Sequence, residues 1–212
     1  MSIDKVVVSI LLGDGHVSKR GTIQIKHSIV QKEYLKFKCL ILEQHGFKTR
    51  IYEREELSYG VLRKFVVADG YASSASKELR SILYPDGVKV VPACYVEEFD
   101  FLDWSFIFMD DGRANTLSHT NNLINGIRVR KETEKFTNRY EICTESFSKE
   151  DNSLLVKNLS VLGIDSYISN RNRIIISRAE SKILFYEGIK VFIVPSMKYK
   201  IESIPSLSYK SQ

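Results

Sequence analysis

The stretch Phe101-Leu-Asp-Trp-Ser-Phe-Ile-Phe-Met-Asp-Asp-Gly112 decides the fold, because the chain contains a near-copy of it at Val6-Val-Val-Ser-Ile-Leu-Leu-Gly-Asp-Gly15. Each is an apolar run of helical length that ends in an acid followed by glycine. The acid is Asp14 in the first copy and Asp111 in the second, and close to half of the 212 residues separates them. A repeat of this kind predicts two related halves in one chain.

The composition is that of a packed globular protein with a basic surface. Hydrophobic residues make up 43% of the chain, and the formal net charge is +5 with a pI near 9.0. A basic chain favours a polyanionic partner. No apolar run approaches the length needed to cross a bilayer, so no membrane partner is expected. The three cysteines are odd in number and scattered, which indicates an intracellular, reducing compartment, whether the gene is organellar, bacterial or phage-encoded.

Helix and strand patterns follow one another in the same order in both halves. Apolar residues at helical spacing identify the helices, and alternating apolar and polar residues identify the strands. In the first half we expect helices at 4–13, 31–45 and 74–84, and strands at 21–27, 49–54 and 62–67. In the second half we expect helices at 100–110, 148–162 and 179–185, and strands at 124–130, 139–144, 166–169 and 173–177.

This order predicts an α+β fold in which antiparallel strands are grouped between helices, rather than a strict alternation of strand and helix. The two halves are expected at residues 1–97 and 98–212. Because two copies of one unit in a single chain are equivalent to a symmetric dimer, the protein is expected to be a monomer.

A carboxylate in the last turn of a helix faces the negative end of the helix dipole, which costs about 0.3–1 kcal/mol at the surface. Asp14 and Asp111 both stand there, and a divalent cation is the obvious compensating charge. The small residues Ser9, Gly13 and Ser105 would let the two helices approach closely and bring both acids to one end of their contact. Two carboxylates and free helix-end carbonyls would suit Mg²⁺. The alternative is an ordinary turn, because Asp-Gly is a strong turn signal.

Long polar side chains fall on one face of several expected strands in both halves. Such a face of an antiparallel sheet can enter a DNA groove and reach base edges, although a solvated sheet face is the simpler alternative. The candidate DNA contacts are Thr22, Gln24, Lys26, Arg50, Tyr52, Arg54, Lys64, Arg128, Arg130, Arg139, Glu141, Arg171 and Arg173.

Two segments resemble the signature motifs of the LAGLIDADG homing endonucleases of the single-chain, intron-encoded type. They are Val7-Val-Ser-Ile-Leu-Leu-Gly-Asp-Gly15 and Trp104-Ser-Phe-Ile-Phe-Met-Asp-Asp-Gly112, and Val194-Pro-Ser-Met-Lys-Tyr-Lys200 is a further match. The resemblance covers nearly the whole chain. It implies two pseudo-symmetric αββαββα-type halves, an antiparallel β-sheet saddle that sits in the DNA major groove, and two motif helices packed at the centre.

The resemblance also implies roles for the residues at the two helix ends. Asp14 and Asp111 match the acids that bind metal and take part in catalysis. The carbonyl groups of Gly13 and Asp110 match additional metal ligands. The register with Asp14 favours Asp111 over Asp110 as the acid that binds metal through its side chain.

Four further residues match active-site positions of the family. Lys89 and Lys200 match the basic residue that each half holds near the scissile phosphate, where a lysine would offset charge or polarise the attacking water. His27 and Glu145 stand where the family often has a glutamine that holds water or phosphate. Neither is a like-for-like replacement, so the rate of the reaction could differ.

The implied activity is site-specific hydrolysis of both strands of a long, pseudo-palindromic double-stranded DNA site, which leaves short 3′ overhangs. Mg²⁺ is the expected cofactor, Mn²⁺ a substitute, and Ca²⁺ an ion that supports binding without cleavage. One alternative is a maturase that binds group I intron RNA, and another is a catalytically silent DNA-binding protein of the same fold. The presence of both acids favours the nuclease.

Overall fold

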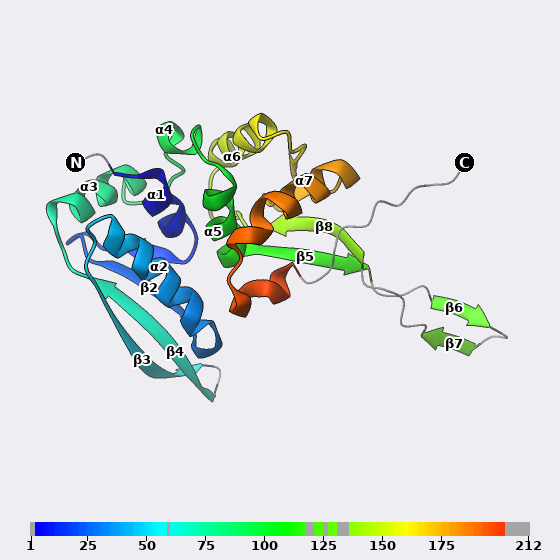
Figure 1. Ribbon diagram of the computed structural model, residues 1–212, viewed down its shortest axis with the longest axis horizontal. Coiled ribbons are helices and arrows are strands. Elements are labelled where there is room, and N and C mark those ends of the chain that lie inside the picture. The colour runs from blue at the N-terminus through cyan, green and yellow to red at the C-terminus, as the bar shows by residue number, and fades with distance from the viewer. Residues whose placement is uncertain (1–2, 59, 118–120, 125–126, 131–135, 202–212) are drawn as a thin grey trace.

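Two segments of the chain share one order of elements, αββαββα, and together they make up most of the molecule (Figure 1). The computed structural model describes residues 3–58, 60–117, 121–124, 127–130 and 136–201. The first segment contains, in order, α1 (Lys5–Leu12), β1 (Gly15–Val17), β2 (Ile23–Ser28), α2 (Lys32–Gln44), β3 (Thr49–Ser58), β4 (Val61–Gly70) and α3 (Ser74–Leu83).

The second segment repeats this order after a connection that holds α4 (Ala93–Val96). Its elements are α5 (Phe101–Asp111), β5 (Gly112–Leu117), β8 (Phe136–Ile142), α6 (Lys149–Val161), β9 (Tyr167–Ile168), β10 (Ile174–Ile176) and α7 (Ala179–Ile189). Between β5 and β8 the chain forms a separate ribbon of β6 (Asn121–Ile124) and β7 (Ile127–Arg130). The 3₁₀ helices among the described residues are η1 (Ile29–Gln31), η2 (Lys190–Phe192) and η3 (Pro195–Lys200).

Each half contains a four-stranded antiparallel sheet with the same topology. The strand order is β1-β2-β4-β3 in the first half and β5-β8-β10-β9 in the second. When each strand is exchanged for its counterpart in the αββαββα order, the two strand orders are identical. The glycines that follow the two acids also pair alike, with Gly15 opposite Ile25 and Gly112 opposite Ile142. The duplication that the sequence predicted is therefore present in the topology, and the predicted α+β fold is confirmed.

The helices α1 and α5, which carry the two motifs, pack against each other at the centre of the molecule (Figure 1). Ser9 and Ser105 are fully buried in them, and each hydroxyl donates a hydrogen bond to the carbonyl three residues earlier. Neither serine therefore leaves an unpaired polar group in the core. Both helices are apolar but short, and among the described residues no helix has the length and apolar character needed to span a bilayer.

The predicted strand over 124–130 is wrong. β6 and β7 run antiparallel in that region, with Ile124 opposite Ile127. In the sequence, Asn-Gly at 125–126 is a strong hairpin signal, and the prediction of one continuous strand did not take it into account. The strands β1 and β5 were not predicted, because neither shows an apolar–polar alternation long enough to indicate a strand. The other predicted helices and strands are confirmed, although β3 and β4 are longer than predicted.

Candidate active site

The carboxyl ends of α1 and α5 meet, and the two motifs contact each other there. The backbone N–H of Asp14 donates a hydrogen bond to Oδ2 of Asp110, at 2.9 Å. Gly13 makes this contact possible, because a Cβ atom at that position would lie 2.2 Å from the same oxygen. The predicted arrangement, in which touching helices bring their acidic ends together, is therefore present.

The carboxylate of Asp110 points into the first half of the molecule rather than toward solvent. Both of its oxygens accept hydrogen bonds from Lys38 Nζ, at 2.6 Å each, and Oδ1 also accepts one from the Tyr34 hydroxyl, at 2.9 Å. The side chains of Lys38 and Asp110 are both fully buried. Burial alone would raise the pKa of Asp110, but the charge of Lys38 holds that pKa below its ordinary value. The Asp110 side chain is thus bound by the protein itself.

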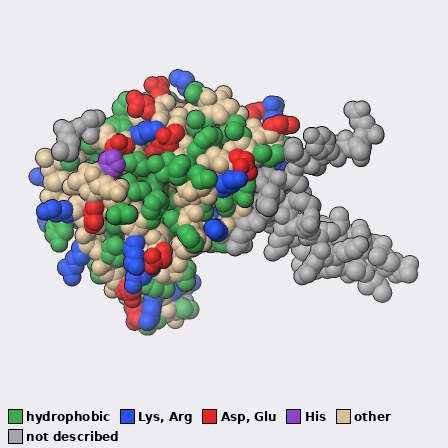
Figure 2. Space-filling model, in the orientation of Figure 1, with side chains coloured by type: hydrophobic (Ala, Val, Ile, Leu, Met, Phe, Trp, Pro, Cys, Tyr) green, Lys and Arg blue, Asp and Glu red, His purple; other side chains and the backbone are tan. Residues whose placement is uncertain are grey.

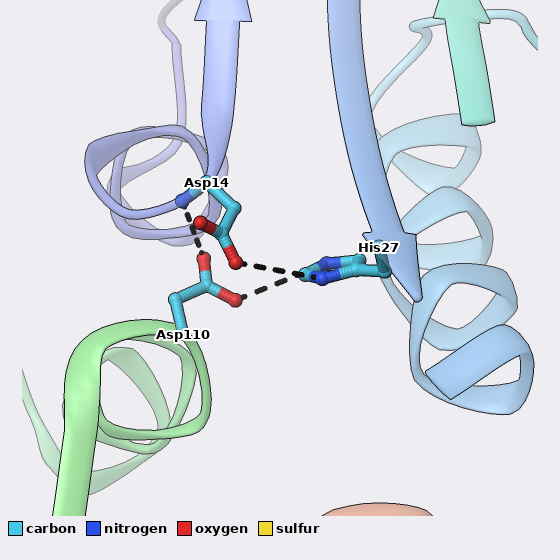
Figure 3. A group of neighbouring side chains, drawn as sticks. All are labelled: Asp14, His27 and Asp110. Carbon is cyan, nitrogen blue, oxygen red and sulfur yellow. Dashed lines mark hydrogen bonds and ion pairs between the residues drawn. The ribbon is translucent and has the colours of Figure 1, made fainter. Parts of the chain in front are cut away.

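His27 lies on the buried face of β2, and its ring faces the carboxylates of Asp14 and Asp110 (Figure 3). Its Nε2 atom lies 3.3 Å from Lys38 Nζ, and its Nδ1 atom lies 3.4 Å from Oδ2 of Asp14. Burial, together with the charge of Lys38, lowers the pKa of His27 to about 3, so the ring is neutral at physiological pH. Asp14, His27 and Asp110 have potential metal-ligating atoms within 4.8 Å of one another, but the ammonium group of Lys38 already neutralises Asp110.

Lys89 and Lys200 make matching contacts with the last turns of the two motif helices. Lys89 Nζ donates to the carbonyl oxygens of Gly13 and Gly15, at 2.8 and 2.7 Å. Lys200 Nζ donates to the carbonyl oxygen of Asp110, which corresponds to Gly13, at 2.6 Å. Burial lowers the pKa of both lysines, to about 8 for Lys89. The structure therefore brings the two predicted lysines to the acidic helix ends.

The carboxylates of Asp14 and Asp111 are held in a way that disfavours their negative charge. Burial, together with the neighbouring charges of Asp110 and Asp14, raises the pKa of Asp111 to about 7 against the opposing effect of Lys200. Partial burial and the charge of Asp110 also raise the pKa of Asp14. A surface pocket of about 340 Å³ opens beside Asp111 and is lined in part by Lys200. An additional cation here would stabilise both carboxylates.

Glu145, the predicted counterpart of His27, makes different contacts. It forms an ion pair with Arg173, and its side chain is 39% exposed, whereas that of His27 is 2% exposed. The two positions therefore do not have equivalent environments in the two halves.

The exposed face of the first sheet has an acid at its centre. Gln24 of β2 and Arg50 of β3 both lie opposite Asp69 of β4. The Asp69 carboxylate accepts hydrogen bonds from Gln24 Nε2, at 2.9 Å, and from the Tyr52 hydroxyl, at 2.8 Å. Asp69 thereby fixes the orientation of two predicted DNA contacts.

Toward the far end of β3 and β4, basic and acidic side chains pair with each other. Lys26 and Arg54 both form ion pairs with Glu56, and Lys64 forms one with Glu55. Lys64 lies opposite Glu55, so the two side chains project from the same face of the sheet. Arg54, the neighbour of Glu55 in β3, projects from the opposite face. Figure 2 shows Lys and Arg side chains interspersed with acids over this end of the two strands.

The second sheet holds one buried acid among three arginines. Oε2 of Glu141 accepts a hydrogen bond from Arg113, at 2.8 Å, and lies 3.7 Å from Arg139. Oε1 of Glu141 accepts a hydrogen bond from Arg173, at 2.9 Å. Burial alone would raise the pKa of Glu141, but the arginines hold it below its ordinary value. The cluster thus presents fixed guanidinium groups with a net positive charge.

The remaining predicted DNA contacts lie outside these two clusters. Arg171 is exposed, and Thr22 precedes β2, where its N–H donates to Ser18 Oγ at 3.0 Å. Arg128 and Arg130 belong to β7, but their side chains lie outside the described residues.

Sequence reasoning missed four residues that shape the site. Lys38 and Tyr34 lie on the buried face of α2, where a lysine among apolar residues was the available signal. Asp69 and Arg113 act through cross-strand pairing, and Arg113 lies on β5, a strand that the sequence did not indicate.

Comparison with known proteins agrees with the motifs. A profile of the LAGLIDADG DNA endonuclease family matches residues 4–184. The homing endonuclease I-WcaI, whose structure was solved bound to its DNA recognition sequence, has a similar fold with a TM-score of 0.73. The similarity covers 95% of this chain and 88% of that chain, at 18% sequence identity. At this identity the likeness concerns the fold.

Proposed function

The chain belongs to the LAGLIDADG DNA endonuclease family, and from that premise we propose that it is a site-specific endonuclease that cuts both strands of a long, pseudo-palindromic DNA site with a divalent metal ion. The observation that carries this proposal is the meeting of the helix ends that bear Asp14 and Asp111, with Lys89 and Lys200 beside them. Cleavage would leave short 3′ overhangs, and the protein would act as a monomer.

The side chains at the helix ends fit a divalent cation. Asp14 and Asp111 supply hard oxygen atoms. Burial and the charge of Asp110 raise the pKa of both carboxyl groups, so a bound cation would favour their charged forms. The carbonyl oxygens of Gly13 and Asp110 would be further ligands, since each has a second lone pair besides the one that accepts the lysine. Oxygen ligands of this kind suit Mg²⁺, which would activate water and neutralise the leaving oxygen. Mn²⁺ would substitute, and Ca²⁺ would support binding without cleavage.

The chain's own side chains would position the DNA. Lys89 and Lys200 stand at the helix ends with their ammonium groups fixed by carbonyls, where they would offset the charge of a scissile phosphate. The halves 1–97 and 98–212 would each read one half-site through the sheet faces built around Asp69 and Glu141. The chain has 31 lysine and arginine residues, so DNA affinity should fall steeply with salt.

The test is a cleavage assay with purified protein. The substrates are DNA made by joining the sequences that flank the gene, and a randomised DNA library. With Mg²⁺ we expect a double-strand cut at one site, and with Ca²⁺ a complex that is not cut. EDTA and the Asp14→Asn/Asp111→Asn double variant serve as controls. If the wild-type protein with Mg²⁺ cuts neither substrate, or if the double variant cuts as well as the wild type, the proposal is wrong.

A further inference from the structure

Lys38 has a fully buried ammonium group and no role in the cleavage reaction proposed above. An ammonium has three donors and no acceptor. The structure offers Lys38 three acceptors, namely the two carboxylate oxygens of Asp110, at 2.6 Å, and Nε2 of His27, at 3.3 Å. Lys38 therefore joins an acid of the second half to a histidine of the first.

This contact assigns the proton on the His27 ring. Because Lys38 can only donate, Nε2 of His27 must be the accepting, unprotonated nitrogen. The ring proton of the neutral imidazole is then on Nδ1, the atom that faces Oδ2 of Asp14 at 3.4 Å. The chain of polar contacts thus runs from Lys38 through His27 to Asp14, and it places an N–H group against one oxygen of that carboxylate. Figure 3 shows the His27 ring facing the Asp14 carboxylate.

The described residues of the second half do not form the same chain of contacts. The helices α2 and α6 are both 13 residues long, and overlaying them places Leu155, a buried apolar residue, at the position of Lys38. Glu145 stands in place of His27 and pairs with Arg173. Among the described residues, therefore, the Asp111 carboxylate has no counterpart of the Lys38–His27 pair.

We propose that Lys38 is a positioning residue that acts through His27 on Asp14, and that the loss of this chain of contacts slows the cut made at Asp14 more than the cut made at Asp111. This inference rests on the proposed function. The Nδ1–H group of His27 faces Oδ2 of Asp14 at 3.4 Å and would thereby orient this carboxylate toward a metal ion. Groups that orient metal-binding carboxylates in this way contribute about 10–100-fold to activity or metal affinity. The loss of His27 should therefore slow one of the two cuts more than the other.

The experiment measures cleavage of each strand separately, with the two strands of the target carrying different end labels. His27→Phe keeps a ring but removes the N–H, whereas His27→Asn keeps an N–H at the position of Nδ1. In His27→Phe the ratio of the two strand-cleavage rates should change by about 10-fold or more. In His27→Asn the ratio should return toward that of the wild type. Lys36→Met, which removes an exposed lysine of the same helix, should leave both rates unchanged. Equal slowing of both cuts in His27→Phe, or no slowing, would overturn the inference.

A second measurement does not depend on cleavage or on the folding of a variant. Nitrogen-15 NMR of the wild-type protein distinguishes the two neutral forms of a histidine ring, and the chain has only four histidines. We expect His27 to carry its proton on Nδ1. A proton on Nε2 would overturn the inference even if the enzyme cuts DNA. If the wild type cuts no DNA while His27 is protonated on Nδ1, the proposed function fails and the polar chain stands.

Discussion

Asp14 and Asp111 end equivalent helices in the two halves, yet the protein holds them differently. Both are followed by glycine, and a lysine donates to the carbonyl of the preceding residue in each case. Behind Asp14, however, lie a neutral histidine and a buried ammonium, whereas beside Asp111 lies an open pocket. Duplication has thus preserved the parts that would bind metal and phosphate, while the surrounding side chains have diverged. A single chain permits this, because its halves can change independently.

The largest expected effect comes from removing either acid. Asp14→Asn and Asp111→Asn should each slow cleavage by more than about a hundredfold, because even outer-shell partners of a metal contribute about 10–100-fold. Single-turnover cleavage at saturating protein measures this effect. Asp165→Asn, which changes an exposed acid paired with Arg178, should cut at the wild-type rate. If one of the two acid variants retains the wild-type rate, Asp14 and Asp111 do not contribute equally to catalysis.

The next largest effect concerns the buried ion pair of Lys38 and Asp110, which joins the two halves. Lys38→Met should lower the free energy of unfolding by about 3–5 kcal/mol, because it leaves the Asp110 carboxylate buried without its partner. Lys36→Met, on the same helix, breaks only an exposed pair with Glu33 and should cost less than about 0.5 kcal/mol. Urea denaturation of both variants gives the comparison. Similar losses in the two would mean that the buried pair contributes no more than a surface pair.

The repeated elements of the two halves could be predicted from sequence because each depends on neighbouring residues. The motif helices have a local apolar pattern, and acid-glycine endings mark where they stop, so Asp14 and Asp111 follow from the sequence directly. Lys89 and Lys200 were found only through the family resemblance, because an isolated lysine in a loop indicates nothing by itself. The structure places both at the acids.

The divergent surroundings of the acids could not be predicted, because they depend on contacts between residues far apart in the chain. Lys38 and Asp110 are 72 residues apart, and the burial of either is known only when the two halves are packed together. The three arginines around Glu141 depend likewise on the register of β5 and β8. In that register Arg113 stands opposite Glu141, and the sequence indicates neither β5 nor its pairing.

In each half, an acid on the sheet fixes the orientation of a candidate DNA contact. Asp69 holds Gln24 in the first half, and Glu141 holds Arg173 in the second. Gln24→Ala should reduce discrimination at one base of one half-site by about 1–3 kcal/mol, the contribution of a good base contact. Competition binding in Ca²⁺ against targets changed one base at a time measures this. A uniform loss of affinity for all targets would instead assign Gln24 to a phosphate contact.

The smallest expected effect is the pH dependence of metal binding, which distinguishes Asp111 from Asp14. The pKa of Asp111 is raised to about 7, so this carboxyl group holds its proton below that pH and releases it above. A metal ion needs the deprotonated form, so protons compete with the ion as the pH falls. Ca²⁺ affinity, measured by calorimetry, should therefore fall by about fivefold between pH 7 and pH 6. Asp14→Asn should keep a pH dependence but shift it to lower pH, because the charge of Asp14 contributes to the raised pKa of Asp111. Asp111→Asn should lose the pH dependence. If Asp111→Asn retains it and Asp14→Asn does not, the group that titrates near neutral pH belongs to the first half instead.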